Sequence, residues 1–353
     1  MKHYLSVDIG GTKILGGVVT EHGDVLARCK EKTEKGQQKK ILEQTERVID
    51  NCLQAANLTA SDLSGIAFGV PGVVDSQANY VISTPNAPLT DTQLGAHITE
   101  KYGVPAIVGN DANVGVIGEY WKGAAREAQS AYGIFVGTGI GGGLVLDGKL
   151  IEGFRSLGGE IGNLIIPLDA DEIAGMLTKK HTRLEELCSR TAIENQLRHA
   201  ILKEGRKSSL IEITGDKKLE RIRSKALKEA LRRKDPLVVD VMRRASFLLG
   251  LTTASVLHIV DPEVIVFGGG VIEACGDFML PLIEKTAHKV ALPGNGKPLK
   301  IVRSSLGDDA ILLGGVALLR ERNFPERNTP LAPASAAKAP ARPLAQVDKP
   351  LQG

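Results

Sequence analysis

The first residues with types and spacing suited to chemistry form the stretch Asp-Ile-Gly-Gly-Thr-Lys, Asp8 to Lys13, between two apolar runs. Two β-type runs joined by Gly-Gly and a hydroxyl residue predict a hairpin whose turn brings bare backbone N–H groups close to an anion. Asp8 could hold a hydrated Mg²⁺, while Thr12 and Lys13 supply a hydroxyl and a cation for phosphoryl oxygens. The pattern fits a phosphate site and equally an ordinary surface hairpin.

A second glycine-rich stretch, residues 137–143, also follows an apolar run. Gly137, Gly139 and Gly142 formally satisfy the dinucleotide pattern Gly-x-Gly-x-x-Gly, but that pattern must open a helix. Here alternating apolar residues and an Asp-Gly turn come next, which predicts strand, turn and strand. The glycines therefore predict a second hairpin rather than a dinucleotide site.

The two hairpins belong to a repeat within the chain. Residues 4–19 and 132–146 share the order of apolar strand, turn containing Gly-Thr, and glycine-led second strand. A later echo links residues 66–74 with residues 264–272, each interpreted as a buried strand with a glycine turn. We therefore expect a duplicated α/β domain with a nucleotide in the cleft between the copies.

Two further groups of polar side chains interrupt apolar segments. Asn110 and Asp111 follow a short apolar strand and precede a helical run, so they either cap that helix or aim a carboxylate into a cleft. Glu160 and Asn163 lie in a glycine-lined, otherwise apolar segment. They are candidates for contacting a polyhydroxylated ligand, although a lone Glu in a loop is usually only solvated.

Length and composition bound the class of protein. A chain of 353 residues has room for two domains, and 42% hydrophobic with 24% charged residues is typical of a globular protein. We expect a cytoplasmic protein without a membrane segment, because the cysteines form no Cys-x-x-Cys pair and neither a signal peptide nor a bilayer-length apolar run is visible. A net charge of +3 is too small to indicate nucleic-acid binding, and the Lys/Arg-rich residues 217–234 are interpreted as a solvated helical face.

The elements that must position these residues follow from hydrophobic periodicity. The Pro/Ala-rich residues 323–353 cannot bury enough apolar surface to offset the entropy of ordering, and a disordered tail is predicted there. Helical spacing predicts helices over residues 38–56, 94–102, 172–186, 238–260, 279–289 and 310–321.

Five motifs in register resemble those of the ROK family of bacterial sugar kinases and repressors. The resemblance covers residues 4 to about 322. The motifs are Asp8-Ile-Gly-Gly-Thr-Lys13, Gly109-Asn-Asp-Ala-Asn113, Gly137-Thr-Gly-Ile-Gly-Gly-Gly143, Gly158-Gly-Glu-Ile-Gly162 and Gly268-Gly-Gly-Val271.

The resemblance implies an actin-like or hexokinase-like ATPase fold of the α/β class, with two RNase H-type domains and a cleft between them. The first domain is expected over residues 1–112, with the final helix 310–322 added to it, and the second over residues 113–309. Relatives of this kind are usually homodimers or homotetramers. No nucleic-acid or membrane partner is expected.

The resemblance also implies an ATP-dependent, Mg²⁺-requiring hexokinase of glucokinase type that phosphorylates the 6-hydroxyl of glucose or a related hexose. Asp111 would be the general base, and Asp8 would hold Mg²⁺ through water. Sugar-binding residues would be Gly72, Asn86, Asn110, Asp111, Glu160, Asn163 and Glu185. Nucleotide-binding residues would be Asp8, Gly10, Gly11, Thr12, Lys13, Gly137, Thr138, Gly139, Gly268, Gly269 and Gly270.

Other interpretations stay open. The acceptor could be an N-acetylated hexosamine or fructose, which the pocket near Gly72, Asn86 and Asn163 would decide, and the donor could be polyphosphate. A sugar-responsive regulator is less expected, since repressors of the family carry a helix-turn-helix segment ahead of the first strand and three residues precede that strand here. A silent sugar sensor is disfavoured because the residues expected for phosphate binding and base catalysis are present.

One departure from the family concerns zinc. Many members carry a His shortly after Glu-Ile-Gly and a Cys-x-Cys-x₄-Cys loop, which together bind structural zinc. Here Asn163 replaces that His, and Met176, Thr178 and Arg183 stand near the positions of the cysteines. A structural zinc site needs about four ligands, so their joint loss predicts that no zinc is bound.

Metal analysis tests this expectation. Protein purified without chelators should contain no stoichiometric zinc, because thiolate and imidazole ligands are missing at the expected positions. One tightly held zinc per chain would contradict the interpretation of Asn163 and of the segment after it.

Overall fold

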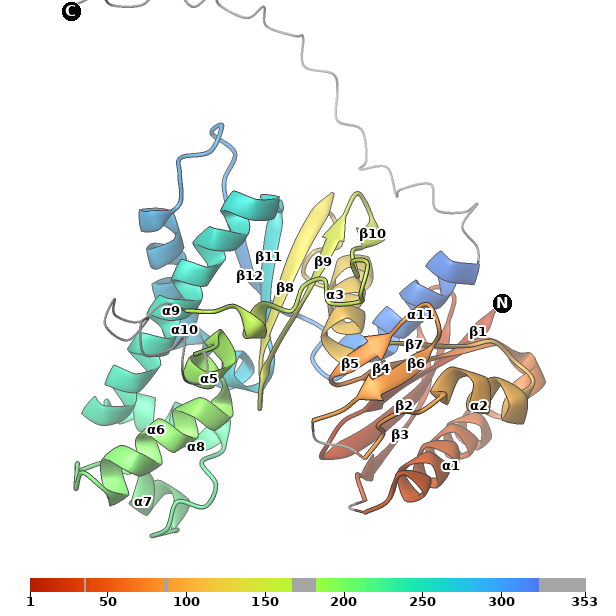
Figure 1. Cartoon of the computed structure of the whole chain (residues 1–353), viewed down its shortest axis with the longest axis horizontal. Coiled ribbons are helices and arrows are strands. Elements are labelled where there is room, and N and C mark those ends of the chain that lie inside the picture. Colours follow the sequence, from red (N-terminus) through yellow and green to blue (C-terminus); the bar gives the residue numbers. More distant parts are fainter. Residues whose placement is uncertain (35, 86–87, 167–181, 324–353) are drawn as a thin grey trace, which may run out of the picture.

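The computed structural model describes residues 1–34, 36–85, 88–166 and 182–323, and these are built around two sheets (Figure 1). The first sheet has the order β3-β2-β1-β4-β7. Its first three strands form an antiparallel meander, and β4 and β7 continue the sheet in parallel beside β1. The strands are β1 (His3–Ile9), β2 (Lys13–Thr20), β3 (Val25–Lys32), β4 (Leu63–Val70) and β7 (Ala106–Asn110).

The second sheet repeats this design in the order β10-β9-β8-β11-β12. Again three strands form an antiparallel meander, and two further strands continue in parallel. Position by position, the two sheets have the same connectivity, as the internal repeat predicts. The strands are β8 (Ser130–Val136), β9 (Ile140–Leu146), β10 (Lys149–Leu150), β11 (Val264–Gly268) and β12 (Lys300–Arg303).

Helices cover both faces of the first sheet. Successive side chains of a strand point to opposite faces, so neighbouring residues of β1 belong to different cores. Leu5 and Val7 belong to the core beneath the helices α1 and α2, whereas Tyr4 packs with residues of α11 on the other face. A two-stranded ribbon of β5 and β6 extends this half. These elements are α1 (Gln38–Ala56), the 3₁₀ turn Ala60–Asp62, β5 (Val73–Asp75), β6 (Tyr80–Ser83), α2 (Leu94–Tyr102) and α11 (Asp309–Asn323).

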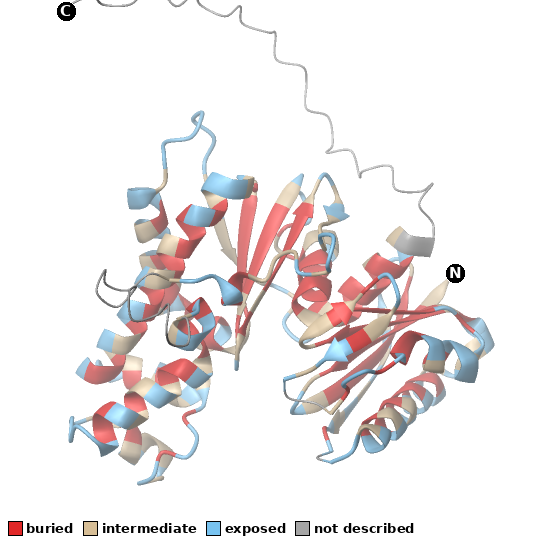
Figure 2. Cartoon of the chain, viewed as in Figure 1, coloured by how far each residue is buried: buried red, intermediate tan, exposed pale blue. Residues whose placement is uncertain are grey.

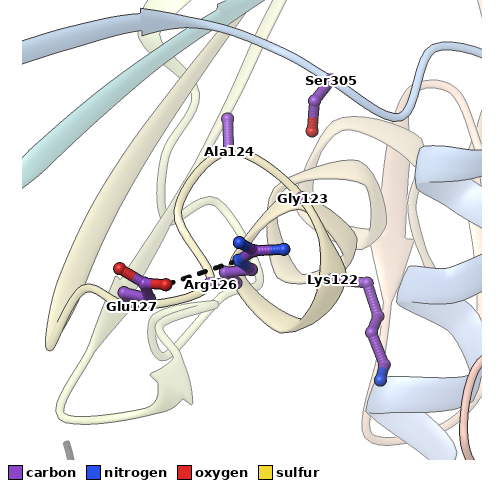
Figure 3. Close-up of a pocket in the computed structure, with 6 residues that line it drawn as sticks. All are labelled: Lys122, Gly123, Ala124, Arg126, Glu127 and Ser305. Carbon is purple, nitrogen blue, oxygen red and sulfur yellow. Dashed lines mark ion pairs between the residues drawn. The ribbon is translucent and has the colours of Figure 1, made fainter.

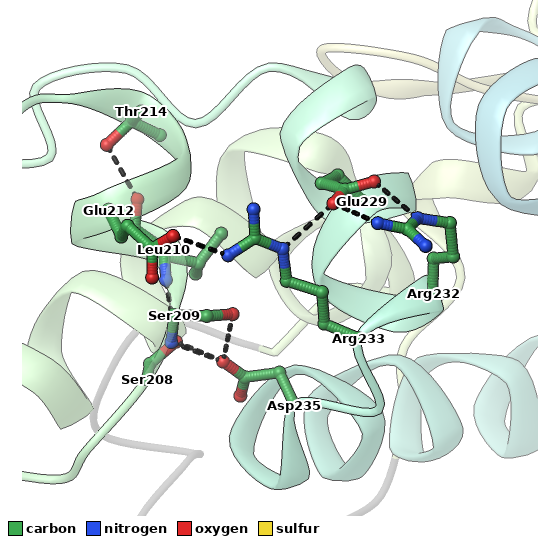
Figure 4. Close-up of polar contacts among 9 residues, drawn as sticks. All are labelled: Ser208, Ser209, Leu210, Glu212, Thr214, Glu229, Arg232, Arg233 and Asp235. Atoms are coloured by element: carbon green, nitrogen blue, oxygen red, sulfur yellow. Dashed lines mark hydrogen bonds and ion pairs between the residues drawn. The ribbon is translucent and has the colours of Figure 1, made fainter.

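The second sheet is covered in the same way. Tyr132 and Ile134 join the largest core, which the long helices α9 and α10 close, and Figure 2 shows buried residues concentrated on the sheets and on the helix faces against them. Asp235 caps α9 by accepting from Leu237 N and Val238 N, and it also accepts from the hydroxyls of two serines before α7 (Figure 4). The helices are α5 (Leu184–Cys188), α6 (Arg190–Leu202), α7 (Leu210–Thr214), α8 (Ser224–Arg232), α9 (Pro236–Val260) and α10 (Gly270–Val290).

The two halves meet where α3 (Asp111–Lys122) crosses α11 (Figure 1). The helices approach backbone to backbone: a Cβ at Gly118 would collide with Ala310 O, and a Cβ at Gly314 would collide with Val114 O. α3 lies against β9 of the second sheet and α11 against β1 of the first. This crossing therefore sets how the two sheets face each other.

A buried carboxylate reinforces the crossing. Glu119 of α3 is fully buried and accepts hydrogen bonds from the backbone nitrogens of Ser305 and Leu306, at 3.0 and 2.9 Å, and from Ala124 N at 2.8 Å. Ser305 and Leu306 lie in the segment that leads from β12 to α11. One carboxylate thus binds that segment to α3, and backbone N–H donors compensate its desolvation.

Most predicted helices are confirmed, with two corrections. The helix expected over residues 279–289 begins at Gly270, directly after the glycines at the end of β11, so the echo between residues 66–74 and 264–272 ends at the strand. The helix expected over residues 172–186 is wrong at residues 182–183, where the backbone is extended and bridges Ile165; α5 begins only at Leu184.

Three further expectations concern residues that the structure does not describe, membrane-spanning helices and the boundary between the domains. Residues 167–181 and the tail from residue 324 lie outside the described residues. In the described ranges, no helix is both long and apolar enough to cross a membrane. The division of the chain at residue 112 stays a prediction, and the structure adds that α3 begins at Asp111.

Replacing Gly314 by Ala tests the crossing. We expect Gly314→Ala to lower the free energy of unfolding by about 1–3 kcal/mol, since the new methyl meets a helix backbone that cannot turn aside, despite the higher helix propensity of Ala. Urea denaturation measures the change. Gly294→Ala is the matched control, because nothing lies within 4 Å of its Cβ position, and equal stability of the two variants would contradict the close approach.

Candidate active site

The first predicted hairpin is present at the turn between β1 and β2. Gly10 N donates to Lys13 O at 2.9 Å, and Thr33, just after β3, donates through its hydroxyl to Gly10 O at 2.6 Å. Lys13 Nζ lies 2.6 Å from an oxygen of Asp308 and 4.0 Å from one of Asp8. The turn that contains Gly10, Gly11 and Thr12 is therefore held at both ends.

The second predicted hairpin joins β8 to β9 and is held by the start of α6. Arg190 N donates to Gly137 O at 2.9 Å, Arg190 Nη2 donates to Thr138 Oγ1 at 2.6 Å, and Thr191 Oγ1 donates to Thr138 O at 2.8 Å. Gly137 N also donates to Gly139 O at 2.9 Å. These bonds place an arginine beside the hydroxyl of the turn.

Both hairpins line one pocket of about 480 Å³. Its walls supply hydroxyl groups and many cations, which suits a polyanion such as a chain of phosphates. Sequence reasoning does not predict Arg190 and Arg221 in this lining, and Arg221 corrects the interpretation of residues 217–234 as only a solvated face. The lining residues are Thr12, Lys13, Lys30, Glu31, Lys32, Thr138, Arg190 and Arg221.

The third glycine group lies against the second hairpin. Gly268 ends β11 and pairs with Phe135 of β8, and Gly270 begins α10. Gly269 between them has φ +83°, and a Cβ there would stand 2.6 Å from Val136 O. Glycine is therefore required at Gly269 by conformation and by space. Contact with the adenosine stays a prediction.

The structure confirms the helix cap at Asn110, whereas a carboxylate of Asp111 aimed into a cleft stays a prediction. Asn110 Oδ1 caps α3 by accepting from Ala112 N at 2.9 Å and Asn113 N at 3.2 Å, while its amide donates to Gly72 O at 3.0 Å. Asp111 accepts from Ala112 N at 2.8 Å. The cap thus fixes the backbone from which the Asp111 carboxylate projects.

In three pairs of predicted site carboxylates, the charge of one side chain raises the pKa of the other. Burial, followed by the charge of Asp111, raises the pKa of Asp8 to about 7. Burial raises the pKa of Asp111 to about 6, with the charge of Glu160 acting in the same direction. Burial also raises the pKa of Glu160, and the charge of Glu185 adds to it. The acids in these pairs come from both halves of the molecule, Asp8 from the first and Glu160 and Glu185 from the second.

Asp8 fits a magnesium ion held through water. Within the described residues, no group of three or more His, Cys, Asp or Glu side chains could hold a metal by itself. Mg²⁺ commonly keeps several waters and takes only one or two protein carboxylates together with substrate phosphates. The buried Asp8, next to Lys13 of the cationic pocket, matches that requirement, because a divalent cation would compensate the burial and the neighbouring charge of Asp111 that raise its pKa.

The remaining predicted sugar residues are placed as follows. Glu160 precedes the 3₁₀ turn Ile161–Asn163, and Asn163 Nδ2 donates to Glu160 Oε2 at 2.9 Å. Glu185 is not free: its Oε2 accepts from Ile140 N, beside the second hairpin, at 2.7 Å. Asn86 lies outside the described residues, as do Met176 and Thr178.

A further pocket of about 400 Å³ lies at the end of α3 (Figure 3). None of the predicted site residues lines it. Its walls come from residues that follow or end α3 and from the segment after β12, so it belongs to the junction between the halves. The lining residues are Lys122, Gly123, Ala124, Arg126, Glu127 and Ser305.

Comparison with known proteins decides the family. The family described as "ROK family" matches residues 4–322 of the chain. The chain belongs to the ROK family. The resemblance drawn from the five motifs is thereby confirmed over the same range.

Relatives in the ROK family include kinases for different sugars. A glucokinase of Thermotoga maritima is 31% identical over 328 residues, which are 90% of this chain and 97% of that protein. An N-acetyl-D-glucosamine kinase of Vibrio cholerae is 30% identical over 319 residues, 89% of this chain and 99% of that protein.

A solved structure of a ROK family glucokinase from Streptomyces griseus, in complex with glucose and AMPPNP, has a TM-score of 0.75 at 27% identity and covers 90% of this chain and 99% of that one. A ROK hexokinase from Thermus thermophilus has a TM-score of 0.73 at 26% identity, over 92% of this chain and 99% of that one. These similarities confirm the expected two-domain actin-like fold.

The raised pKa of Asp8 predicts a pH-dependent gain from Asp8→Asn. A folded-state pKa of about 7 against 3.8 means that the native chain holds this proton more tightly than the unfolded chain, so wild-type stability falls as pH rises through that window. Asparagine does not ionise. We expect Asp8→Asn to become more stable than wild type by roughly 2–4 kcal/mol at pH 8, with the advantage lost near pH 4.

Urea unfolding across pH measures this difference. Asp216→Asn is a control of opposite sign, because backbone N–H groups lower the pKa of Asp216 and its charge contributes stability as pH rises. A difference between Asp8→Asn and wild type that does not vary with pH would show that Asp8 ionises normally.

Proposed function

We propose that the protein is an ATP-dependent hexokinase of glucokinase type that transfers the terminal phosphoryl group of Mg-ATP to the 6-hydroxyl of glucose or a related hexose. The proposal rests on one observation above all: the buried carboxylate of Asp111 projects from the capped start of α3, and its charge helps to raise the pKa of Asp8, whose neighbour Lys13 lines the cationic pocket between the two hairpins. Membership of a family with sugar kinases supports the reaction class.

Asp111 has the properties of a general base for a sugar hydroxyl. A base with a pKa of about 6 is largely deprotonated at neutral pH and still more basic than an ordinary aspartate. Its cap at Asn110 holds the carboxylate in one place, which phosphoryl transfer requires because donor, acceptor oxygen and base must be aligned.

The pocket between the hairpins has the properties of a donor site. Lys13, Arg190 and Arg221 can neutralise phosphates, and Thr12 and Thr138 can donate hydroxyl hydrogen bonds. A bound Mg²⁺, held by Asp8 and phosphate oxygens, would supply positive charge where negative charge develops. The S. griseus relative binds AMPPNP, an ATP analogue, which supports ATP as the donor.

An N-acetylhexosamine kinase is the second candidate. The 30% identity to an N-acetyl-D-glucosamine kinase favours it as an alternative acceptor within the same chemistry. Glu160 and Asn163, bonded to each other, present the polar surface on which the acceptor would be chosen. The homodimer or homotetramer, the cytoplasmic location and the place in carbohydrate metabolism, such as glycolysis, stay predictions beside this proposal.

Asp111→Asn tests the base. We expect turnover to fall by several orders of magnitude while sugar binding is kept, since asparagine preserves shape and hydrogen bonding but cannot take a proton. ADP release from Mg-ATP should be measured with glucose, mannose, fructose, N-acetylglucosamine and N-acetylmannosamine, and sugar binding by calorimetry.

Asp240→Asn on the exposed side of α9 is the matched control and should keep wild-type turnover. Turnover with one sugar, lost only in Asp111→Asn, would establish the kinase and name its acceptor. Near-normal turnover of Asp111→Asn would remove Asp111 as the base, and no ADP release with any sugar in the wild type would overturn the proposed reaction with ATP.

A further inference from the structure

The loop that carries Glu160 is paired with the segment that leads into α5. Leu184 N donates to Leu164 O at 2.9 Å, and Ile165 and Arg183 form an antiparallel bridge. Short backbone pairing of this kind fixes where the side chains on either side stand. It brings the side chain of Arg183 alongside the turn that ends at Asn163.

Two hydrogen bonds join three side chains next to this turn. Arg183 Nη1 donates to Asn163 Oδ1 at 3.0 Å, and Asn163 Nδ2 donates to Glu160 Oε2 at 2.9 Å. A guanidinium has only donors, so it selects the oxygen of the Asn163 amide. The amide nitrogen must then face Glu160, which as a carboxylate has only acceptors. The donor chemistry of Arg183 therefore sets the direction of both hydrogen bonds.

The bond from Asn163 acts directly on Glu160. Burial raises the pKa of Glu160, and the Asn163 hydrogen bond is the contribution that lowers it. The bond also holds one of the two oxygens, Oε2, while no hydrogen bond to Oε1 is found in the part of the chain that the structure describes. One carboxylate oxygen is thus fixed by the protein and the other can accept from a ligand.

We propose that Arg183 is a positioning residue of the sugar site, which acts through the Asn163 amide to hold the Glu160 carboxylate as a hydrogen-bond acceptor for a sugar hydroxyl. This inference rests on the proposed function. Arg183 donates a hydrogen bond to Asn163 and acts on the sugar only through Asn163 and Glu160. Glu160, Asn163 and Arg183 thus act as one unit. When the arginine is lost, the side-chain amide of Asn163 is free to rotate and exchange the places of its oxygen and nitrogen.

Binding of the nucleotide should not depend on the unit formed by Arg183, Asn163 and Glu160. The backbone next to Arg183 leads to Glu185, whose carboxylate accepts from Ile140 N beside the second hairpin. A change of the Arg183 side chain leaves that backbone and that bond in place. The relay therefore predicts an effect on the sugar and little effect on the nucleotide.

Arg183→Met is the sharpest single variant, because it keeps the aliphatic stem and removes the donors. We expect the dissociation constant for glucose, or for the best acceptor of the sugar panel, to rise about tenfold by calorimetry, the loss typical of one hydrogen bond to a charged group. KM for ATP should stay unchanged. The acid limb of kcat/KM for the sugar should move to higher pH, since the pKa of Glu160 rises without the amide donor.

A double-mutant cycle separates the relay from simple packing. In an Asn163→Ala background, Arg183→Met should add nothing further, because its route to Glu160 is already broken. Arg183→Lys should restore most of the affinity, as an ammonium is also a donor without acceptors. Arg232→Ala, an exposed arginine of α8 paired with Glu229, is the matched control and should bind sugar like wild type.

The outcomes are distinct. Wild-type protein that neither binds nor phosphorylates any sugar of the panel would overturn the proposed function. Tight sugar binding by wild type that is equal in Arg183→Met, or an additive effect in the cycle, would overturn the positioning role of Arg183. Thermal melting of each variant shows that it is folded. Should Arg183→Met fail to fold, Arg183→Gln carries the comparison, because its amide can accept as well as donate and no longer fixes the direction of the Asn163 amide.

Discussion

The contact on which the rest of the structure depends is the crossing of α3 and α11. Gly118 and Gly314 let the two backbones touch, and the buried carboxylate of Glu119 binds the segment before α11 to α3. Because α3 begins at Asp111 and rests on the second sheet while α11 rests on the first, this contact sets the base relative to both phosphate hairpins. A side chain in place of either glycine would move the whole site.

Charge is separated across that site. Lys13, Arg190 and Arg221 line the pocket between the hairpins together with one acid, Glu31, whereas Asp111 and Glu160 are not among its lining residues. A polyanion is drawn to the pocket and a neutral polyol with hydroxyl donors suits the two acids outside it. Burial, and after it the charge of neighbouring acids, raises the pKa values of Asp8, Asp111 and Glu160, and substrate hydroxyls and a divalent cation are the groups that would compensate these effects.

The acceptor side is held by hydrogen bonds where many members of the family are expected to use a metal. Asn163 replaces the His expected among the zinc ligands, Arg183 stands near the position of an expected cysteine, and the two side chains form a hydrogen bond with each other. Both arrangements would join the Glu160 loop to the segment before α5. The Arg–Asn pair has an added consequence, because its donor and acceptor order fixes the Asn163 amide and through it Glu160.

Local patterns by themselves determined much of this protein: the two hairpins, the repeat between the halves, the helix over residues 38–56, and the candidates Asp8 and Asp111. Period and turn chemistry act between near neighbours, so they can be read from the chain. Only the tertiary structure decided that Arg190 meets Thr138, that Arg221 lines the donor pocket, that Glu185 bonds to Ile140 and that α10 begins at Gly270. The first three contacts join residues far apart in the chain, whose packing no local period encodes. Gly269, which precedes α10, lies against Val136 at the end of β8, and this contact too joins distant parts of the chain.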